Sequence, residues 1–149
     1  MNGGTRLRPE AAGAGVVAAV LLVADQLTKL LVSQAGQVME LGPVTIAPLV
    51  NRSGVLGLPV ANDILLVAGV LIAAGIIWLL RRTARPMLQV GLWLLLAGAL
   101  GNTIDRVTSG GALDIIAIGP SSHFNLADIW ILLGGGALLF GLWRKDAGA

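Results

Sequence analysis

Four aspartates of this sequence lie inside or at the edges of long apolar runs, at positions Asp25, Asp105, Asp114 and Asp128. Asp114, in "ALDII", and Asp128, in "FNLADI", have no basic neighbour in the sequence. If these two carboxylates meet, they share one proton near neutral pH, so one can accept a proton from water while the other polarises a carbonyl. That chemistry is peptide hydrolysis by an aspartic mechanism. The alternative for Asp128 is an acid favoured by the dipole at a helix N-terminus, with Asn125 as the capping residue.

The other two acids have polar or basic neighbours that predict a supporting role. Asp25 and Lys29 are one helical turn apart, in the order that favours an ion pair, so they either neutralise each other or line the site and contact substrate. In "GNTIDR", Asn102 and Asp105 share a helix face and Arg106 follows directly. A guanidinium beside a carboxylate holds it ionised, and we therefore expect Asp105 to brace the site through hydrogen bonds.

Other chemistries fit the sequence less well. A zinc site needs several His, Cys or carboxylate ligands at metal spacing, whereas the chain has one histidine, His123, and no cysteine. We expect His123 at the membrane interface, and neither a metal nor an organic cofactor. A Ser–Lys nucleophile would have to use Lys29, but no serine shares its helix face.

The composition is that of a membrane protein. The chain has 149 residues, of which 56% are hydrophobic and 12% charged, too apolar for a soluble domain of this length. About 20 apolar residues cross a bilayer as a helix. Four runs meet this length, near residues 11–32, 61–80, 87–104 and 124–143. We expect an all-α integral membrane protein with four spans, forming one domain over residues 1–149.

The placement of basic residues predicts the topology. One side of the membrane receives Arg6, Arg8, Arg81, Arg82, Arg85, Arg144 and Lys145, and the other Lys29, Arg52 and Arg106. The positive-inside rule then puts both termini in the cytoplasm and the four acids towards the outer leaflet. Because the basic residues flank spans, nucleic-acid binding is not expected. The first span could instead be a cleaved signal peptide ending at "SQA", although Asp25 and Lys29 interrupt its apolar stretch.

Two segments are expected outside the membrane. The first, between spans one and two, contains "PVTIAPLV", whose β-branched residues predict a small extracytoplasmic β element on the membrane surface. The second, residues 106–123, contains "GGALDIIAIG", an apolar run too short to span, which we expect to rest at the interface as a loop. Small residues within the spans, such as Gly98 and Gly101, allow close helix approach.

The ordered motifs "ADQLTK", "GALGNTIDR", "ALDII" and "FNLAD" resemble those of the lipoprotein signal peptidase family, also called signal peptidase II. The resemblance covers essentially the whole chain. It implies an aspartic endopeptidase of the bacterial inner membrane that cuts prolipoproteins just before a cysteine already carrying diacylglyceryl. It also implies lipidated precursors and membrane lipid as partners, with the diacylglyceryl transferase acting upstream, and a monomeric enzyme.

The same resemblance assigns site residues. The family's catalytic acids fall on Asp114 and Asp128. The positions that bind substrate or support the site are Asp25, Lys29, Asn51, Gly54, Asn102, Asp105, Arg106 and Asn125.

The chain departs from the family at "NRSGVLG", where N-x-G-A-A-F is usual, and at Ile115, where phenylalanine is usual. These departures bear on substrate preference and on inhibitors such as globomycin. The alternatives are an inactive paralogue, and a non-enzymatic four-span scaffold or small carrier in which the acids form ion pairs or a proton path.

Overall fold

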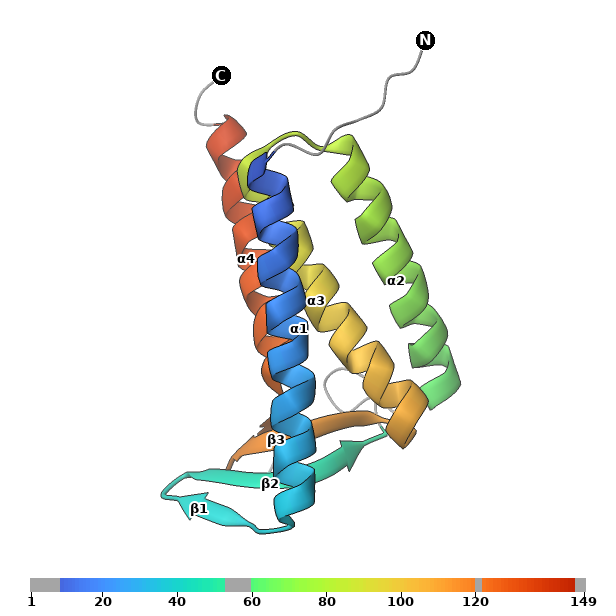
Figure 1. The fold of residues 1–149 in the computed structure, drawn as a ribbon, viewed down its shortest axis with the longest axis vertical. Helices are drawn as coiled ribbons and strands as arrows, with labels where there is room; N and C mark the ends of the chain where they lie inside the picture. Colours follow the sequence, from blue (N-terminus) through green and yellow to red (C-terminus); the bar gives the residue numbers. More distant parts are fainter. Residues whose placement is uncertain (1–8, 53–59, 120–121, 147–149) are drawn as a thin grey trace.

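The computed structural model describes residues 9–52, 60–119 and 122–146. This part of the chain forms four helices and the strands of one small sheet (Figure 1). The elements in order are α1 (Pro9–Ala35), β1 (Met39–Leu41), β2 (Val44–Asn51), α2 (Asn62–Arg82), α3 (Pro86–Ser109), β3 (Ala112–Ile118), β4 (Ser122–Phe124) and α4 (Leu126–Asp146).

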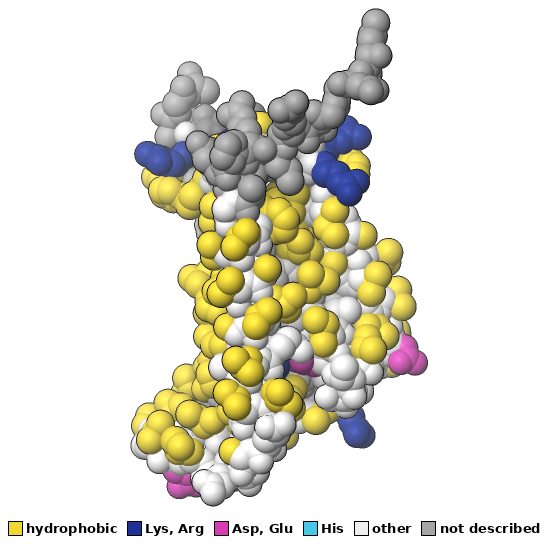
Figure 2. All heavy atoms as spheres, viewed as in Figure 1, with side chains coloured by type: hydrophobic (Ala, Val, Ile, Leu, Met, Phe, Trp, Pro, Cys, Tyr) yellow, Lys and Arg dark blue, Asp and Glu magenta, His cyan; other side chains and the backbone are white. Residues whose placement is uncertain are grey.

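All four helices are long and apolar enough to cross a membrane, which confirms the four predicted spans. Helix α3 lies among the other three and packs against each of them. A cluster including Ile76 and Leu80 of α2 and Leu92 and Leu96 of α3 forms the buried apolar core. Large apolar side chains also point outward, as Figure 2 shows along the length of the helices, and Leu132 is 75% exposed. Such a surface suits contact with lipid.

Helix α3 continues to Ser109, past the predicted end of the third span, so Arg106 is helical although the second outer segment was expected to begin there. The adjacent charges of Asp105 and Arg106 ended the apolar pattern in the sequence, but the Asp105 carboxylate is compensated by the buried Lys29 and the helix goes on. It ends at Gly110, whose φ of 70° is the left-handed conformation that favours glycine.

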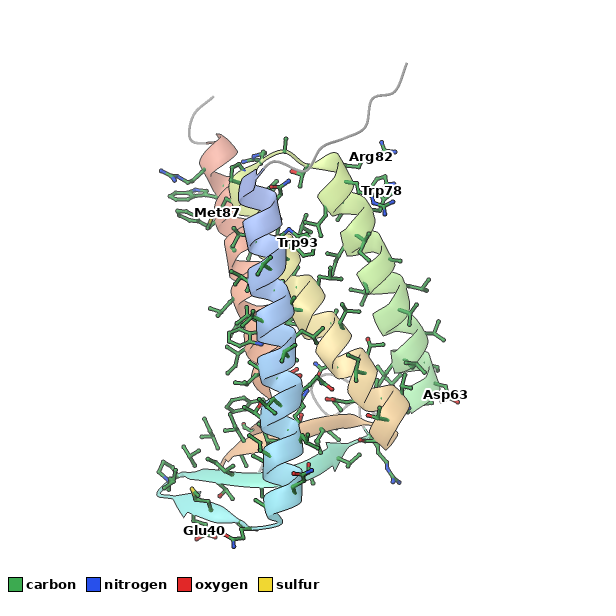
Figure 3. All side chains as sticks on the ribbon, viewed as in Figure 1. Glu40, Asp63, Trp78, Arg82, Met87 and Trp93 are labelled. Carbon is green, nitrogen blue, oxygen red and sulfur yellow. The ribbon has the colours of Figure 1, made fainter. Side chains whose placement is uncertain are left out.

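The link between α2 and α3 is the tight helical hairpin that the sequence predicts. Helix α2 ends at Arg82, and α3 begins at Pro86, whose ring suits the first turn of a helix. The Arg85 guanidinium donates to the carbonyl of Gly141, which ties this link to α4. Arg82 also lies 5.0 Å from the ring centroid of Trp78, and both side chains are at the end of α2 away from the sheet (Figure 3).

The strands form one antiparallel sheet in the order β1-β2-β3-β4, at the end of the helices opposite to the α2–α3 link (Figure 1). Strand β2 confirms the predicted β element. The expectation that the second outer segment is an interfacial loop is wrong, because residues 112–118 form β3 and 122–124 form β4. Strand β3 is covered on both faces, with Asp114 and Ile115 both buried, and such strands appear in a sequence as continuous apolar runs.

A register shift between Ile46 and Leu49 interrupts the pairing of β2 with β3. Ile46 pairs with Ile116 and Leu49 with Asp114, so two residues of β2 lie opposite Ile115 alone. One of the two is Pro48, which has no N–H to give to a ladder. This bulge lies directly beside Asp114 and sets the direction of the strand there.

Candidate active site

Asp114 lies near the centre of the sheet and is 2% exposed. From the neighbouring strand, Asn51 Nδ2 donates to its Oδ2 at 3.0 Å. From the start of α4, Asn125 Nδ2 donates to its Oδ1 at 3.2 Å. Burial raises the pKa of the Asp114 carboxyl, the hydrogen bond from Asn51 opposes this, and the negative charge of Asp128 adds to the rise. The fold therefore favours the protonated form of Asp114 more than water would.

Asp128 lies in the first turn of α4 and is locked to Asn125 by a reciprocal pair of hydrogen bonds. The Asn125 backbone N–H donates to Asp128 Oδ2 at 3.1 Å, and the Asp128 N–H donates to Asn125 Oδ1 at 3.0 Å. The capping role expected of Asn125 is thus present. Asn102 Nδ2, from α3, donates to Asp128 Oδ1 at 2.8 Å. These N–H donors and the N-terminus of α4 suit a negative charge.

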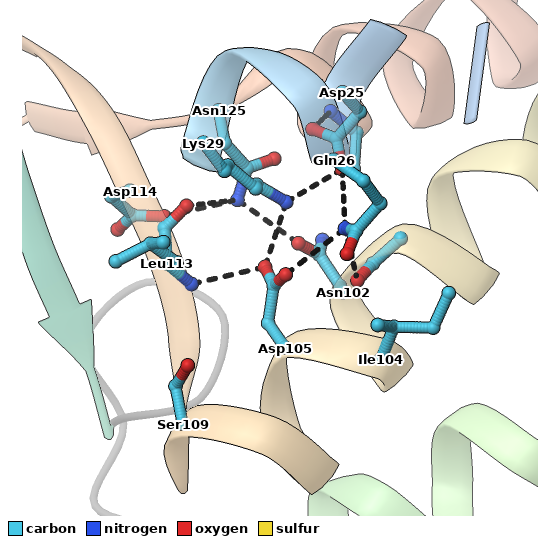
Figure 4. Close-up of polar contacts among 12 residues, drawn as sticks. Asp25, Gln26, Lys29, Asn102, Ile104, Asp105, Ser109, Leu113, Asp114 and Asn125 are labelled. Atoms are coloured by element: carbon cyan, nitrogen blue, oxygen red, sulfur yellow. Dashed lines mark hydrogen bonds and ion pairs between the residues drawn. The ribbon is translucent and has the colours of Figure 1, made fainter. Parts of the chain in front are cut away.

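Asn125 connects the two carboxylates. Its side chain is fully buried, and its Nδ2 lies 3.0 Å from Asn102 Oδ1 as well as near Asp114. One path of hydrogen bonds therefore runs from Asp114 through Asn125 and Asn102 to Asp128. Its first part, from Asp114 to Asn102, can be followed in Figure 4. The structure brings both predicted catalytic acids into one network, together with the predicted support residues Asn51, Asn102 and Asn125.

A second buried group adjoins this network. Lys29 Nζ, on α1, lies 2.7 Å from Asp25 Oδ2 and 2.7 Å from Asp105 Oδ2. The pair expected between Asp25 and Lys29 therefore extends to a third residue on another helix. Arg106 is not the partner of Asp105, because side chains of consecutive helical residues point in different directions. The charge that compensates Asp105 comes from Lys29.

Gln26 belongs to this group and was not predicted. Its Nε2 lies 3.0 Å from Asp25 Oδ2, 3.1 Å from Asp105 Oδ1 and 3.3 Å from the Gly101 carbonyl. A polar amide one residue after Asp25 inside an apolar span was the signal that could have identified it. Helix α1 thus supplies three side chains to the buried group, a role that a cleaved signal peptide could not fill.

Of the remaining predicted residues, Arg106 and His123 belong to the described part of the chain. Arg106 Nη1 donates to the Asn102 carbonyl at 3.1 Å, and its buried Nε has no hydrogen-bond partner in residues 9–52, 60–119 and 122–146. Gly54 and the departures at residues 53–57 lie outside the described residues. His123 is exposed on β4, where it pairs with Ala117.

A family model described as signal peptidase (SPase) II matches residues 17–144. The chain belongs to the signal peptidase II family. Lipoprotein signal peptidase from Halothermothrix orenii is 28% identical over 138 residues, covering 88% of this chain and 95% of that protein. The lipoprotein signal peptidase of Rhodopseudomonas palustris is 33% identical, covering 85% and 87%.

A solved structure supports the same assignment at the level of the fold. A bacterial membrane enzyme determined by the in meso method at 2.3 Å resolution superposes with a TM-score of 0.82 and 26% sequence identity, covering 92% of this chain and 91% of that one. The signal peptidase II family consists of bacterial membrane proteases, and the four apolar helices of this chain agree with membership.

Proposed function

We propose that this signal peptidase II family member is an aspartic endopeptidase. It removes signal peptides from diacylglyceryl-modified prolipoproteins by cutting just before the lipidated cysteine. The observation that carries the proposal is the hydrogen-bonded path from Asp114 to Asp128 through two asparagines, at the sheet end of four membrane-crossing helices. The names of the relatives support the substrate class.

In the proposed mechanism Asp114 is the general acid and Asp128 the general base. Asp128 takes a proton from a water molecule as the water oxygen attacks the carbonyl carbon of the scissile bond, and Asp114 gives its proton to the carbonyl oxygen. The tetrahedral intermediate then collapses. The carbon–nitrogen bond breaks, the amine of the lipidated cysteine takes up the proton from Asp128, and Asp114 regains one from the intermediate. The products are a signal peptide with a new carboxylate and a lipoprotein with a free amino terminus.

The polarity of the molecule supports a site at the outer leaflet of the bacterial inner membrane. Arg81, Arg82, Arg85 and Arg144 all lie near the end of the helices away from the sheet, where Figure 2 shows two groups of basic side chains. The positive-inside rule assigns that end, with both termini, to the cytoplasm. The lipid of the precursor would then stay in the outer leaflet while its signal helix lies beside the spans.

Replacing Asp114 or Asp128 with asparagine tests this function. In membranes supplied with a diacylglyceryl-modified precursor, each variant should insert normally and cleave at least about a hundredfold more slowly, the scale of general acid–base catalysis. Gln89→Met is the control, because Gln89 is a buried polar residue of α3 whose amide donates to the Thr83 carbonyl at the far end. Cleavage at the parent rate by either aspartate variant would contradict the mechanism and favour the scaffold or carrier role.

A further inference from the structure

The two buried carboxylates outside the proposed catalytic pair each hold the backbone beside one catalytic acid. Asp25 Oδ1 accepts a hydrogen bond from the N–H of Ala127 at 2.8 Å. Asp105 Oδ2 accepts one from the N–H of Leu113 at 3.0 Å. Ala127 immediately precedes Asp128, and Leu113 immediately precedes Asp114. Each supporting acid therefore fixes the peptide that carries one catalytic side chain.

Leu113 pairs with Val50 of β2, and on its other side the hydrogen bond to Asp105 replaces the pairing that a longer β4 would supply. Strand β4 pairs with β3 only from Ile116 to Ile118, so Leu113 lies beyond the end of β4. Its N–H is taken by Asp105 and its carbonyl accepts from Asn125 Nδ2 at 3.3 Å. Figure 4 shows both contacts converging on Leu113. Side chains from α3 and α4 thus hold β3 in place one residue before Asp114.

Lys29 links the two acids, Asp25 and Asp105, that hold the backbone beside the proposed catalytic pair. Its ammonium is 2.7 Å from a carboxylate oxygen of each acid, and the residue is 2% exposed, so water does not compete for these contacts. The ion pairs of Lys29 are therefore stronger than they would be in water, because the surroundings have a low dielectric constant. In the described part of the chain Lys29 hydrogen-bonds to Asp25 and Asp105 and to neither proposed catalytic carboxylate.

We propose that Lys29 is a positioning residue that sets the separation of Asp114 and Asp128, acting through Asp105 and Leu113 on one side and through Asp25 and Ala127 on the other. The inference rests on the proposed function, since it assigns a role within that reaction. Two residues that share a proton and a water molecule work only over a narrow range of separations, and a shift of about 1 Å can cost about a hundredfold in rate. Lys29 links the two supporting acids, and these acids hold the backbone that carries Asp114 and Asp128.

The test compares Lys29→Gln with the double variant Lys29→Gln/Asp105→Asn. The single variant leaves two buried carboxylates without their cation, which destabilises the fold. The double variant removes one negative charge as well, so the net charge of the group equals that of the parent, but the ammonium that links the two acids is still missing. Both are measured as full-length protein in lipid, by thermal unfolding and by steady-state cleavage of a diacylglyceryl-modified precursor.

We expect the double variant to recover most of the parent's melting temperature and to keep kcat about a hundredfold low. KM should stay within about twofold, because in this proposal the buried Lys29 acts through Asp25 and Asp105 and its loss is felt in the transition state. The control Gln89→Met, at the other end of α3, should lower the melting temperature without changing kcat. A double variant with the parent kcat would overturn the proposal by showing that Lys29 only balances charge. Absence of folded protein for both Lys29 variants would overturn it too, by making the group a requirement for folding.

Asp114→Asn in the same series separates this inference from the function. If that variant cleaves at the parent rate, the aspartic mechanism itself is wrong. If it is inactive while the Lys29 double variant cleaves normally, only the positioning role fails.

Discussion

Replacing Gly134 with alanine is expected to push α4 away from α3, whereas the same change at the adjacent Gly135 should leave the packing of the two helices unchanged. A Cβ at Gly134 would lie 2.8 Å from the carbonyl oxygen of Gly91 and 2.8 Å from the backbone nitrogen of Leu95. Both are backbone atoms of α3 and cannot rotate away. A Cβ at Gly135 would have nothing within 4 Å.

The size of the effect follows from these contacts. Ordinary van der Waals contact for a Cβ begins at 3.4 Å, so the helices must separate by several tenths of an ångström along their closest approach. Overpacking of this kind costs about 2 kcal/mol of unfolding free energy. For Gly135→Ala we expect no loss, and at most a gain of about 1 kcal/mol from the better helix propensity of alanine.

The assay is reversible unfolding of both variants in mixed detergent micelles, with the cleavage rate measured in parallel. Because α4 carries Asp128, Gly134→Ala should also slow cleavage, and Gly135→Ala should not. Equal stability losses in the two variants, or no loss in Gly134→Ala, would refute the inference that the close approach of α3 and α4 requires glycine at position 134.

Three further outcomes follow from the site and its supports. The pKa of Asp114 is raised in the fold, so its contribution to stability is present at low pH and is lost as the pH rises through the folded-state value. Asn51→Ala removes a hydrogen bond that favours the ionised form of Asp114. The limb of the kcat–pH profile on which Asp114 loses its proton should therefore move to higher pH. If that limb does not move, it reports the titration of another group. Asp105→Asn should lower the unfolding free energy by about 3 kcal/mol, because it breaks a buried ion pair, and the cleavage rate should fall with it. A variant that is as abundant as the parent protein but does not cleave would instead indicate that Asp105 takes part in catalysis directly. Gly110→Ala should cost about 1 kcal/mol in thermal unfolding because of its positive φ, and Gly110→Asn less.

The spans and strand β2 were predictable because they depend on local composition. Runs of apolar residues located α1 to α4, and the β-branched segment before Asn51 located β2. Strand β3 was missed, since a strand buried on both faces has no alternation to distinguish it from an apolar loop. The isoleucines at positions 115, 116 and 118 were the available signal for a strand.

The sequence predicted which residues form the candidate site better than it predicted which of them contact one another. Acids without basic neighbours indicated Asp114 and Asp128. The partner of Asp105 could not be deduced, because Lys29 lies 76 residues away in the sequence and meets it only through the packing of α1 on α3. The contacts to Leu113 and Ala127 use backbone N–H groups, which every residue but proline carries, so the side-chain sequence does not mark them.

Helix α4, which carries Asp128 and is capped by Asn125, is the last element of the described chain to leave the ribosome. Until it is made, the proposed pair lacks its second acid and Asp25 has no Ala127 N–H from which to accept. In the proposed mechanism, a chain synthesised only as far as β4 therefore holds one of the two acids and cannot cut precursors until α4 has joined it.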